Sequence, residues 1–380
     1  MKKIIGPITA IVIGILFFAG CQKETITPGV VDEDMMISNA LAVTPTPIQV
    51  YGVWHAGNDY CTWAKVRDMT DFTLQNKWII NRGDGRPSVN LVVLSFVNPL
   101  KLLNKTNDAG NLDGVPIGMT KEIVDYFKSK EIRVMLSIGG ITYTDYWNQA
   151  LSANATQLGL NAAEVATQLG VGIEIDYEEN SNPNLAGLEA FITAYRSVHK
   201  YDASGTNHAA RLTIDLAAGD RWLIAICRKA TADWLRTDNP VLDYANAMVP
   251  ARQPKSVSEA TANWQEHIDG KPQYGPPIPP LAPAKFTGGL YLITGRTPAN
   301  ECVNYNNSLQ KGCASFVQSI MPHVSLTGAS VGMLGYMFWA AEKPSTRNTS
   351  TAPPNSCEGG IGAGATALNI TIPMPVLRQK

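Results

Sequence analysis

Eight short apolar segments alternate with longer amphipathic stretches along most of this chain. Such alternation is typical of parallel strands joined by crossover helices, because each apolar strand is covered by the helix that follows it. The predicted strands are, in chain order, Ile48–Trp54, Leu91–Val97, Arg133–Ile138, Val171–Asp176, Arg211–Asp215, Ala245–Val249, Gly289–Ile293 and Gly332–Trp339.

The stretches between these strands include three clear helical patterns, Thr120–Lys130, Thr144–Gln168 and Leu185–His199. Repeated strand–helix units within one domain predict an α/β fold, a single (β/α)8 TIM barrel. A doubly wound open sheet is the alternative, but no Gly-x-Gly-x-x-Gly motif follows the first strand. Active sites of such barrels lie at the carboxyl ends of the strands, so polar residues that end these segments are the candidates for function.

The charge balance argues against nucleic acid as a partner. The net charge is −1 and only 17% of the residues are charged, whereas a nucleic-acid-binding protein shows a basic excess. A neutral sugar fits this composition better, because sugars are recognised through hydrogen bonds and aromatic faces rather than through a strong electrostatic field.

The first 20 residues are predicted to be a bacterial lipoprotein signal peptide. Lys2 and Lys3 precede a short apolar stretch, Ile8–Phe18, which is too short to span a membrane comfortably. Cys21 directly follows Ala-Gly and resembles a lipobox cysteine, which would carry the lipid chains (diacylglycerol and palmitate). The alternative is an ordinary secretory signal followed by a chance cysteine.

Residues 21–47 are rich in Thr, Pro, Glu and Asp and are predicted to be a flexible, lipidated tether. The folded domain would then comprise residues 48–380 and contact the membrane through its lipid anchor only. We therefore expect the protein in the bacterial cell envelope, anchored to the outer membrane and facing either the periplasm or the outside of the cell.

Five cysteines remain after Cys21, and an oxidising compartment permits disulfides between them. Cys302 and Cys313 bracket a short polar segment and are the favoured pair, although the odd count leaves at least one free thiol. No spacing of cysteine or histidine resembles a zinc site, so neither a metal nor another cofactor is expected.

Residues 250–285 are expected to form a long, Pro-rich loop that carries Trp264 and Tyr274. Trp54, Trp147 and Trp264 are candidate platforms on which a sugar ring could stack. Packing in the core is the favoured interpretation for each of these three rings.

The segment Val171-Gly-Ile-Glu-Ile-Asp-Tyr-Glu178 carries the strongest chemical signal. Strand alternation places Glu174, Asp176 and Glu178 on one face, and in a barrel this face is the interior. Neighbouring carboxylates raise the pKa of at least one of the group, as a general acid working near neutral pH requires. An exposed strand with a solvated acidic face is the alternative.

These residues resemble glycoside hydrolase family 18, which carries Asp-x-x-Asp-x-Asp-x-Glu on its fourth barrel strand and Ser-x-Gly-Gly on its third. Ser137, Gly139 and Gly140 match the second motif, one helix upstream of the acidic strand. The segment Tyr336-Met-Phe-Trp339 looks like the family's last strand, whose Trp forms the floor beneath the reactive sugar. The resemblance covers roughly residues 48–340 and implies a Bacteroidetes-type lipoprotein member of the family.

By this resemblance, Glu178 would be the proton donor and Asp176 would orient the substrate's acetamide, with Glu174 beside them. The substrate's own 2-acetamido oxygen would act as nucleophile, and the anomeric configuration would be retained. Ser137, Gly139, Gly140, Tyr177, Met248 and Trp339 are the predicted substrate-binding residues.

The chain departs from the family pattern at three positions. Val171 replaces the first Asp of the acidic motif, and Glu174 replaces the second with a side chain one methylene longer. Many members carry Met-x-Tyr on the sixth strand, where this chain has Met248-Val-Pro250. These departures affect the expected rate more than the expected chemistry, because Asp176 and Glu178 are both present.

Three functions fit this pattern. The favoured one is an endo-β-N-acetylglucosaminidase that acts on N-glycans of glycoproteins as a monomer. A chitinase is the second, but only about 38 residues separate Ile293 from Gly332, too few for the small domain that many chitinases insert there. A non-catalytic glycan-binding lipoprotein is the third, although binding alone would not require Glu178.

Overall fold

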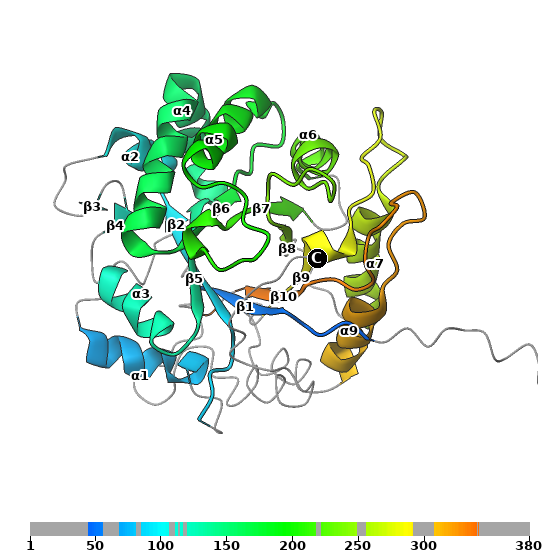
Figure 1. Cartoon of the computed structure of the whole chain (residues 1–380), viewed down its shortest axis with the longest axis horizontal. Coiled ribbons are helices and arrows are strands. Elements are labelled where there is room, and N and C mark those ends of the chain that lie inside the picture. Colours follow the sequence, from blue (N-terminus) through cyan, green and yellow to red (C-terminus); the bar gives the residue numbers. More distant parts are fainter. Residues whose placement is uncertain are drawn as a thin grey trace, which may run out of the picture. The chain divides into compact units, whose positions relative to one another are not determined.

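Eight parallel strands close into a barrel in the order β1-β10-β9-β8-β7-β6-β5-β2 (Figure 1). The first strand completes the closure, because β1 pairs with β2 on one side and with β10 on the other. The predicted (β/α)8 barrel is thereby confirmed, and each of the eight predicted strands overlaps an observed one. The barrel strands are β1 (Val50–His55), β2 (Leu91–Val97), β5 (Arg133–Gly139), β6 (Gly172–Asp176), β7 (Leu212–Ala217), β8 (Ala245–Met248), β9 (Phe286–Tyr291) and β10 (Gly335–Trp339).

This computed structural model describes residues 45–55, 68–80, 85–105, 111–112, 115–116, 120–217, 222–248, 256–291, 308–339 and 341. The predicted signal peptide, Cys21 and nearly all of the predicted tether lie outside the described residues. Thr46 donates its backbone N–H to Gln318 and its hydroxyl to Val331, both at 2.9 Å, so it already belongs to the barrel domain.

Helices surround the strands, as Figure 1 shows for α3, α4 and α5 on the side of β5 and β6. The three predicted helices match α3, α4 and α5 to within two residues at each end. A small hairpin, β3 (Asn111–Leu112) with β4 (Val115–Pro116), stands apart from the barrel sheet. The α-helices are α1 (Met69–Ile80), α2 (Pro99–Asn104), α3 (Thr120–Lys128), α4 (Thr144–Leu169), α5 (Leu185–Val198), α6 (Ile224–Lys229), α7 (Val257–Asp269) and α9 (Ser308–Ser319).

The expected loop over residues 250–285 is wrong in its middle, where α7 spans Val257–Asp269. The hydroxyl of Ser256 caps this helix by accepting a 3.2 Å hydrogen bond from the backbone N–H of Glu259. The local sequence Ser-x-x-Glu is a capping-box pattern, and it is the signal that could have revealed the helix between the Pro-rich flanks.

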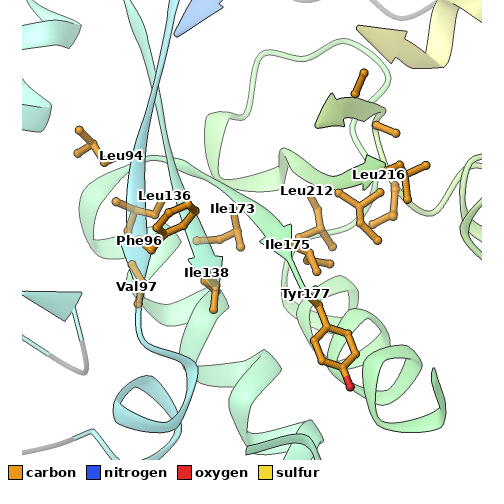
Figure 2. Close-up of a cluster of buried hydrophobic side chains, with 14 of the residues drawn as sticks. Leu94, Phe96, Val97, Leu136, Ile138, Ile173, Ile175, Tyr177, Leu212 and Leu216 are labelled. Atoms are coloured by element: carbon orange, nitrogen blue, oxygen red, sulfur yellow. The ribbon is translucent and has the colours of Figure 1, made fainter. Parts of the chain in front are cut away.

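Because side chains alternate along the strands, some point outward toward the helices and the others point into the barrel. Outward-facing apolar side chains of neighbouring strands form the main core beneath the helices, as Figure 2 shows for Leu136, Ile173 and Ile175. A smaller apolar cluster, including Val93, Met135 and Met337, fills the part of the barrel interior toward the amino ends of the strands. The part toward the carboxyl ends holds buried polar side chains instead.

The predicted Cys302–Cys313 disulfide is not supported. Cys313 is a buried free thiol on α9, and Cys302 lies outside the described residues. Burial raises the pKa of the Cys313 thiol to about 12, so it remains protonated and inert.

Candidate active site

Three acidic side chains follow one another along the inward face of β6 toward its carboxyl end. Glu174 is fully buried, Asp176 is 5% exposed, and Glu178 is half-buried just after the strand ends. Strand alternation produces this arrangement, since every second residue faces the same side. The structure thus places Glu174 and Asp176 in the barrel interior near its carboxyl end, where such folds hold their sites, and Glu178 two residues beyond the end of β6.

Glu174 is fixed by hydrogen bonds from two other strands. The indole Nε1–H of Trp54 donates to Oε1 at 2.8 Å, and Nδ2 of Asn246 donates to Oε2 at 2.6 Å. Asn246 is oriented in turn, because its Oδ1 accepts from the hydroxyl of Thr287 at 2.7 Å. The carboxylate of Glu174 is thus held in one position by a chain of side chains from β1, β8 and β9.

Burial raises the pKa of Glu174 above its usual value, and the surrounding side chains of Trp54, Ser137, Asp215 and Asn246 oppose this rise. Asp215 on β7 is also buried, and its pKa lies well above the usual range. The causes are burial first, and then the charges of Glu174 and Asp176. Two buried carboxyl groups that face each other in this way favour a state in which they share a proton.

The Ser-x-Gly-Gly motif forms the carboxyl end of β5 and lets it approach β6 closely. The backbone N–H of Gly140 donates to the carbonyl of Asp176 at 3.0 Å, and Trp147 donates its indole N–H to the same oxygen at 3.1 Å. A Cβ atom on Gly139 would lie 1.9 Å from this oxygen, and its φ of +123° also favours glycine. Ser137 lies opposite Glu174 in the strand register.

Aromatic rings line the same end of the barrel. Trp339, at the end of β10, is only partly buried and stacks on Phe96 with ring centroids 5.8 Å apart. Trp54 contacts Trp339 with centroids 6.2 Å apart. Trp339 is therefore placed where it could contact a ligand, whereas Trp54 is buried and directs its N–H to Glu174.

Tyr177 does not lie among the candidate ligand-contacting residues. Its side chain is 1% exposed and faces away from the barrel interior (Figure 2). The hydroxyl donates to Asn148 on α4 and accepts from the backbone N–H of Asn184 before α5. The prediction that Tyr177 binds substrate is corrected for this reason, because alternation turns it outward where Asp176 and Glu178 turn inward.

The other predicted residues are placed as follows. Met248 ends β8 and is partly buried, while Val249 and Pro250 lie outside the described residues. Trp147 and Trp264 are fully buried, in agreement with the core interpretation. Asn246, Thr287 and Asp215 were not among the predicted site residues, although each contributes to the environment of Glu174.

Within the described part of the chain, no group of His, Cys, Asp and Glu residues is arranged to hold a metal ion. Among the helices that the structure describes, none combines the length and the apolar character needed to cross a bilayer.

No family model matches the sequence, and no curated protein matches it. The structure is similar to a GH18 chitinase from Pseudoalteromonas aurantia, at 13% identity and a TM-score of 0.49 over 85% of this chain and 100% of that one. It is similar to the Ostrinia furnacalis Group IV chitinase in complex with allosamidin, at 11% identity and a TM-score of 0.47 over 84% and 99% of the two chains. A GH18 chitinase mutant from Cycas revoluta in complex with (GlcNAc)4 matches at 14% identity and a TM-score of 0.43 over 74% and 93%.

Proposed function

We propose that this protein is a glycoside hydrolase that cleaves β-1,4 bonds at N-acetylglucosamine. The observation that carries the proposal is the graded burial of the acidic row on β6. Glu178 is accessible at the carboxyl end of the barrel, Asp176 lies one step deeper, and Glu174 is fully enclosed. An accessible acid supported by a second carboxylate is the arrangement that glycosidic bond cleavage requires.

In the proposed reaction, Glu178 donates a proton to the glycosidic oxygen as the leaving sugar departs. The 2-acetamido oxygen of the substrate attacks the anomeric carbon and forms an oxazolinium ion, so no protein nucleophile is needed. Asp176 orients the acetamide and stabilises the positive charge on its nitrogen. Glu178, now a carboxylate, then removes a proton from the water that opens the oxazolinium ion, and the configuration is retained.

Glu174 and Asp215 have a positioning role in this mechanism. Glu174 is 0% exposed and cannot reach a substrate, but its held carboxyl group and that of Asp215 lie beside Asp176. A proton kept within this buried pair reduces the negative charge facing Asp176, which allows Asp176 to remain an acceptor for the acetamide N–H.

We further propose that the substrate is an N-glycan and that the enzyme is an endo-β-N-acetylglucosaminidase. The chain between β9 and β10 includes α9 and is short for an inserted domain, which favours an open site suited to a branched glycan. A chitinase is the alternative on the same chemistry, and a non-catalytic glycan-binding protein is the third. The retention of Glu178 at the accessible end of the row argues against the last.

The test is to incubate the purified protein with a high-mannose glycoprotein, a complex-type glycoprotein and chitin oligomers, and to determine the product masses. A protein product that keeps one N-acetylglucosamine is the expected result. Release of chitobiose from chitin oligomers alone would assign the protein as a chitinase. Binding without any product would assign it as a glycan-binding protein.

We also propose that Cys21 is lipidated and anchors the protein in the outer membrane of a bacterial cell envelope, with the folded domain as a monomer. The support is the sequence Ala-Gly-Cys21 after a short apolar stretch. The expected result is a membrane-fraction protein whose N-terminal peptide carries the mass of the lipid, and which Cys21→Ser releases. An unchanged location in Cys21→Ser would exclude the anchor.

A further inference from the structure

A small cavity lies at the amino-terminal end of the barrel, opposite the acidic site. Arg133 begins β5, Gly172 begins β6 and Arg211 immediately precedes β7, so their inward faces meet at this end. His208, from the turn before β7, and Met135 also line this cavity. The cavity volume is about 10 Å³, which is room for a single particle of about the size of one water molecule.

Arg133 presents unsatisfied hydrogen-bond donors in this region. Its Nε and Nη2 atoms are buried and make no hydrogen bond within the described residues. Burial, followed by the charge of Arg211, lowers the pKa of Arg133 to about 10, so the guanidinium remains a cation at neutral pH. A buried cation is normally paired, because leaving it without a counter-charge is costly.

The nearby carboxylate of Asp243 is already committed to other groups. It accepts from Arg196 at 2.9 Å, from Arg211, and from the backbone N–H of Leu212 at 2.7 Å. Among the described residues, no ion pair joins Arg133 to any carboxylate. Within the described part of the chain, Asp243 is thus bound to Arg196 and Arg211 and makes no ion pair with Arg133.

His208 adds a neutral donor rather than a counter-charge. Burial, and then the charges of Arg133, Lys128 and Arg211, lower the pKa of its imidazole, so the ring is uncharged at neutral pH. A neutral imidazole can still donate one N–H. The cavity thus has two cationic side chains and one neutral donor on its lining.

We propose that this cavity binds a small monovalent inorganic anion of the size of chloride, held chiefly by Nε and Nη2 of Arg133. The small size of the site, with room for about one water-sized particle, favours a monatomic ion over a phosphate or sulfate ion. The charge selects the sign, because the lining offers donors and positive charge. Such an ion would neutralise the positive charge of Arg133 at the amino-terminal end of the barrel and stabilise the packing of β5, β6 and β7 there.

The test is the thermal midpoint of the full chain as sodium gluconate is replaced by sodium chloride at constant ionic strength. The wild type should gain roughly 2 °C or more over this replacement, since a ligand that binds only the folded state raises its midpoint. Arg133→Met removes the donors and keeps the apolar stem, so its midpoint should not respond to chloride. Arg236→Met, at an exposed arginine paired with Asp238, is the matched control and should respond like the wild type.

Three outcomes would overturn the proposal. The first is an equal chloride response in all three proteins, and the second is no response in any of them. The third is a larger Arg133-dependent response to sulfate or phosphate than to chloride. If Arg133→Met does not fold, chloride NMR linewidths decide with the wild type alone: broadening that bromide reverses supports the site, and unbroadened signals exclude it.

Discussion

The indole N–H of Trp54 donates a 2.8 Å hydrogen bond to Oε1 of Glu174 across the interior of the barrel. The two residues are 120 positions apart in the chain, and β2 and β5 separate their strands on the shorter path around the sheet. Because Asn246 holds the other oxygen, this bond determines the direction in which the buried carboxyl group faces Asp176 and Asp215.

Removing this donor should weaken both the fold and the reaction. Trp54→Phe leaves a buried carboxylate oxygen without its partner, so the free energy of unfolding should fall by about 1–3 kcal/mol. A reoriented Glu174 should lower kcat by about ten- to hundredfold with little change in KM. Urea denaturation and steady-state kinetics measure the two effects. Trp264→Phe is the control, because this buried indole packs against Phe316 and Tyr336, and it should lose stability and keep kcat. An unchanged kcat in Trp54→Phe would argue against a positioning role for Glu174.

Glu178 should be the residue on which hydrolysis depends. Glu178→Gln keeps the shape of the side chain but cannot exchange a proton, so the rate should fall by about 10²–10⁴-fold. Circular dichroism should show an unchanged fold. Glu179→Gln is the matched control, because Glu179 contacts Asn148 and the turn after β6 and should not affect the rate. Retained activity in Glu178→Gln would remove it from the mechanism.

The buried carboxyl pair should make stability depend on pH. The folded-state pKa of Asp215 is raised above its unfolded value, so the folded protein holds a proton that the unfolded chain releases. The contribution of this proton to the free energy of unfolding is complete below the unfolded-state pKa of about 4. It is lost at about 1.4 kcal/mol per pH unit as the pH rises toward the folded-state pKa. Asp215→Asn should therefore flatten the decline of unfolding free energy as pH rises above the unfolded-state pKa of about 4. The exposed Asp269→Asn should keep the wild-type slope, and an unchanged slope in Asp215→Asn would contradict the shared proton.

Gly139 should tolerate no side chain. In Gly139→Ala the Cβ would lie 1.9 Å from the carbonyl oxygen of Asp176, so the ends of β5 and β6 would have to separate. We expect a loss of about 3 kcal/mol or more in unfolding free energy, or no folded protein. Gly85→Ala is the control: its φ is +80° with nothing within 4 Å of the new atom, so only about 1 kcal/mol of backbone strain is expected. Equal losses of unfolding free energy in the two variants would show that the positive φ, and not the contact with Asp176, is what requires glycine at position 139.

Much of the barrel could be predicted from sequence because its determinants are local. Apolar runs such as Leu91–Val97 were located to the residue, and the alternation in β6 placed Glu174 and Asp176 inward. The same alternation turns Tyr177 outward. The prediction that Tyr177 binds substrate therefore came from the motif and not from the strand pattern. Helix α7 was not predicted, because the prolines on both sides of it favour a loop and the Ser-x-x-Glu capping pattern was overlooked.

The hydrogen-bond network around Glu174 could not be predicted in this way. Asn246 contacts that carboxylate, and Thr287 orients Asn246, because β8 and β9 pair in a register that sets Asn246 opposite Thr287. Register is a property of the closed barrel, and a short apolar segment does not determine it. Asp215 is a single acid within β7, and only its position beside Glu174 makes it part of the site.

The close contact between Gly139 and Asp176 also affects how relatives of this protein should be recognised. Selection on Gly139 and Gly140 acts on the geometry of two strand ends, and this geometry is needed whether or not the molecule catalyses anything. Both glycines should therefore be retained in a related barrel that binds sugars without cleaving them, and they do not by themselves indicate catalysis.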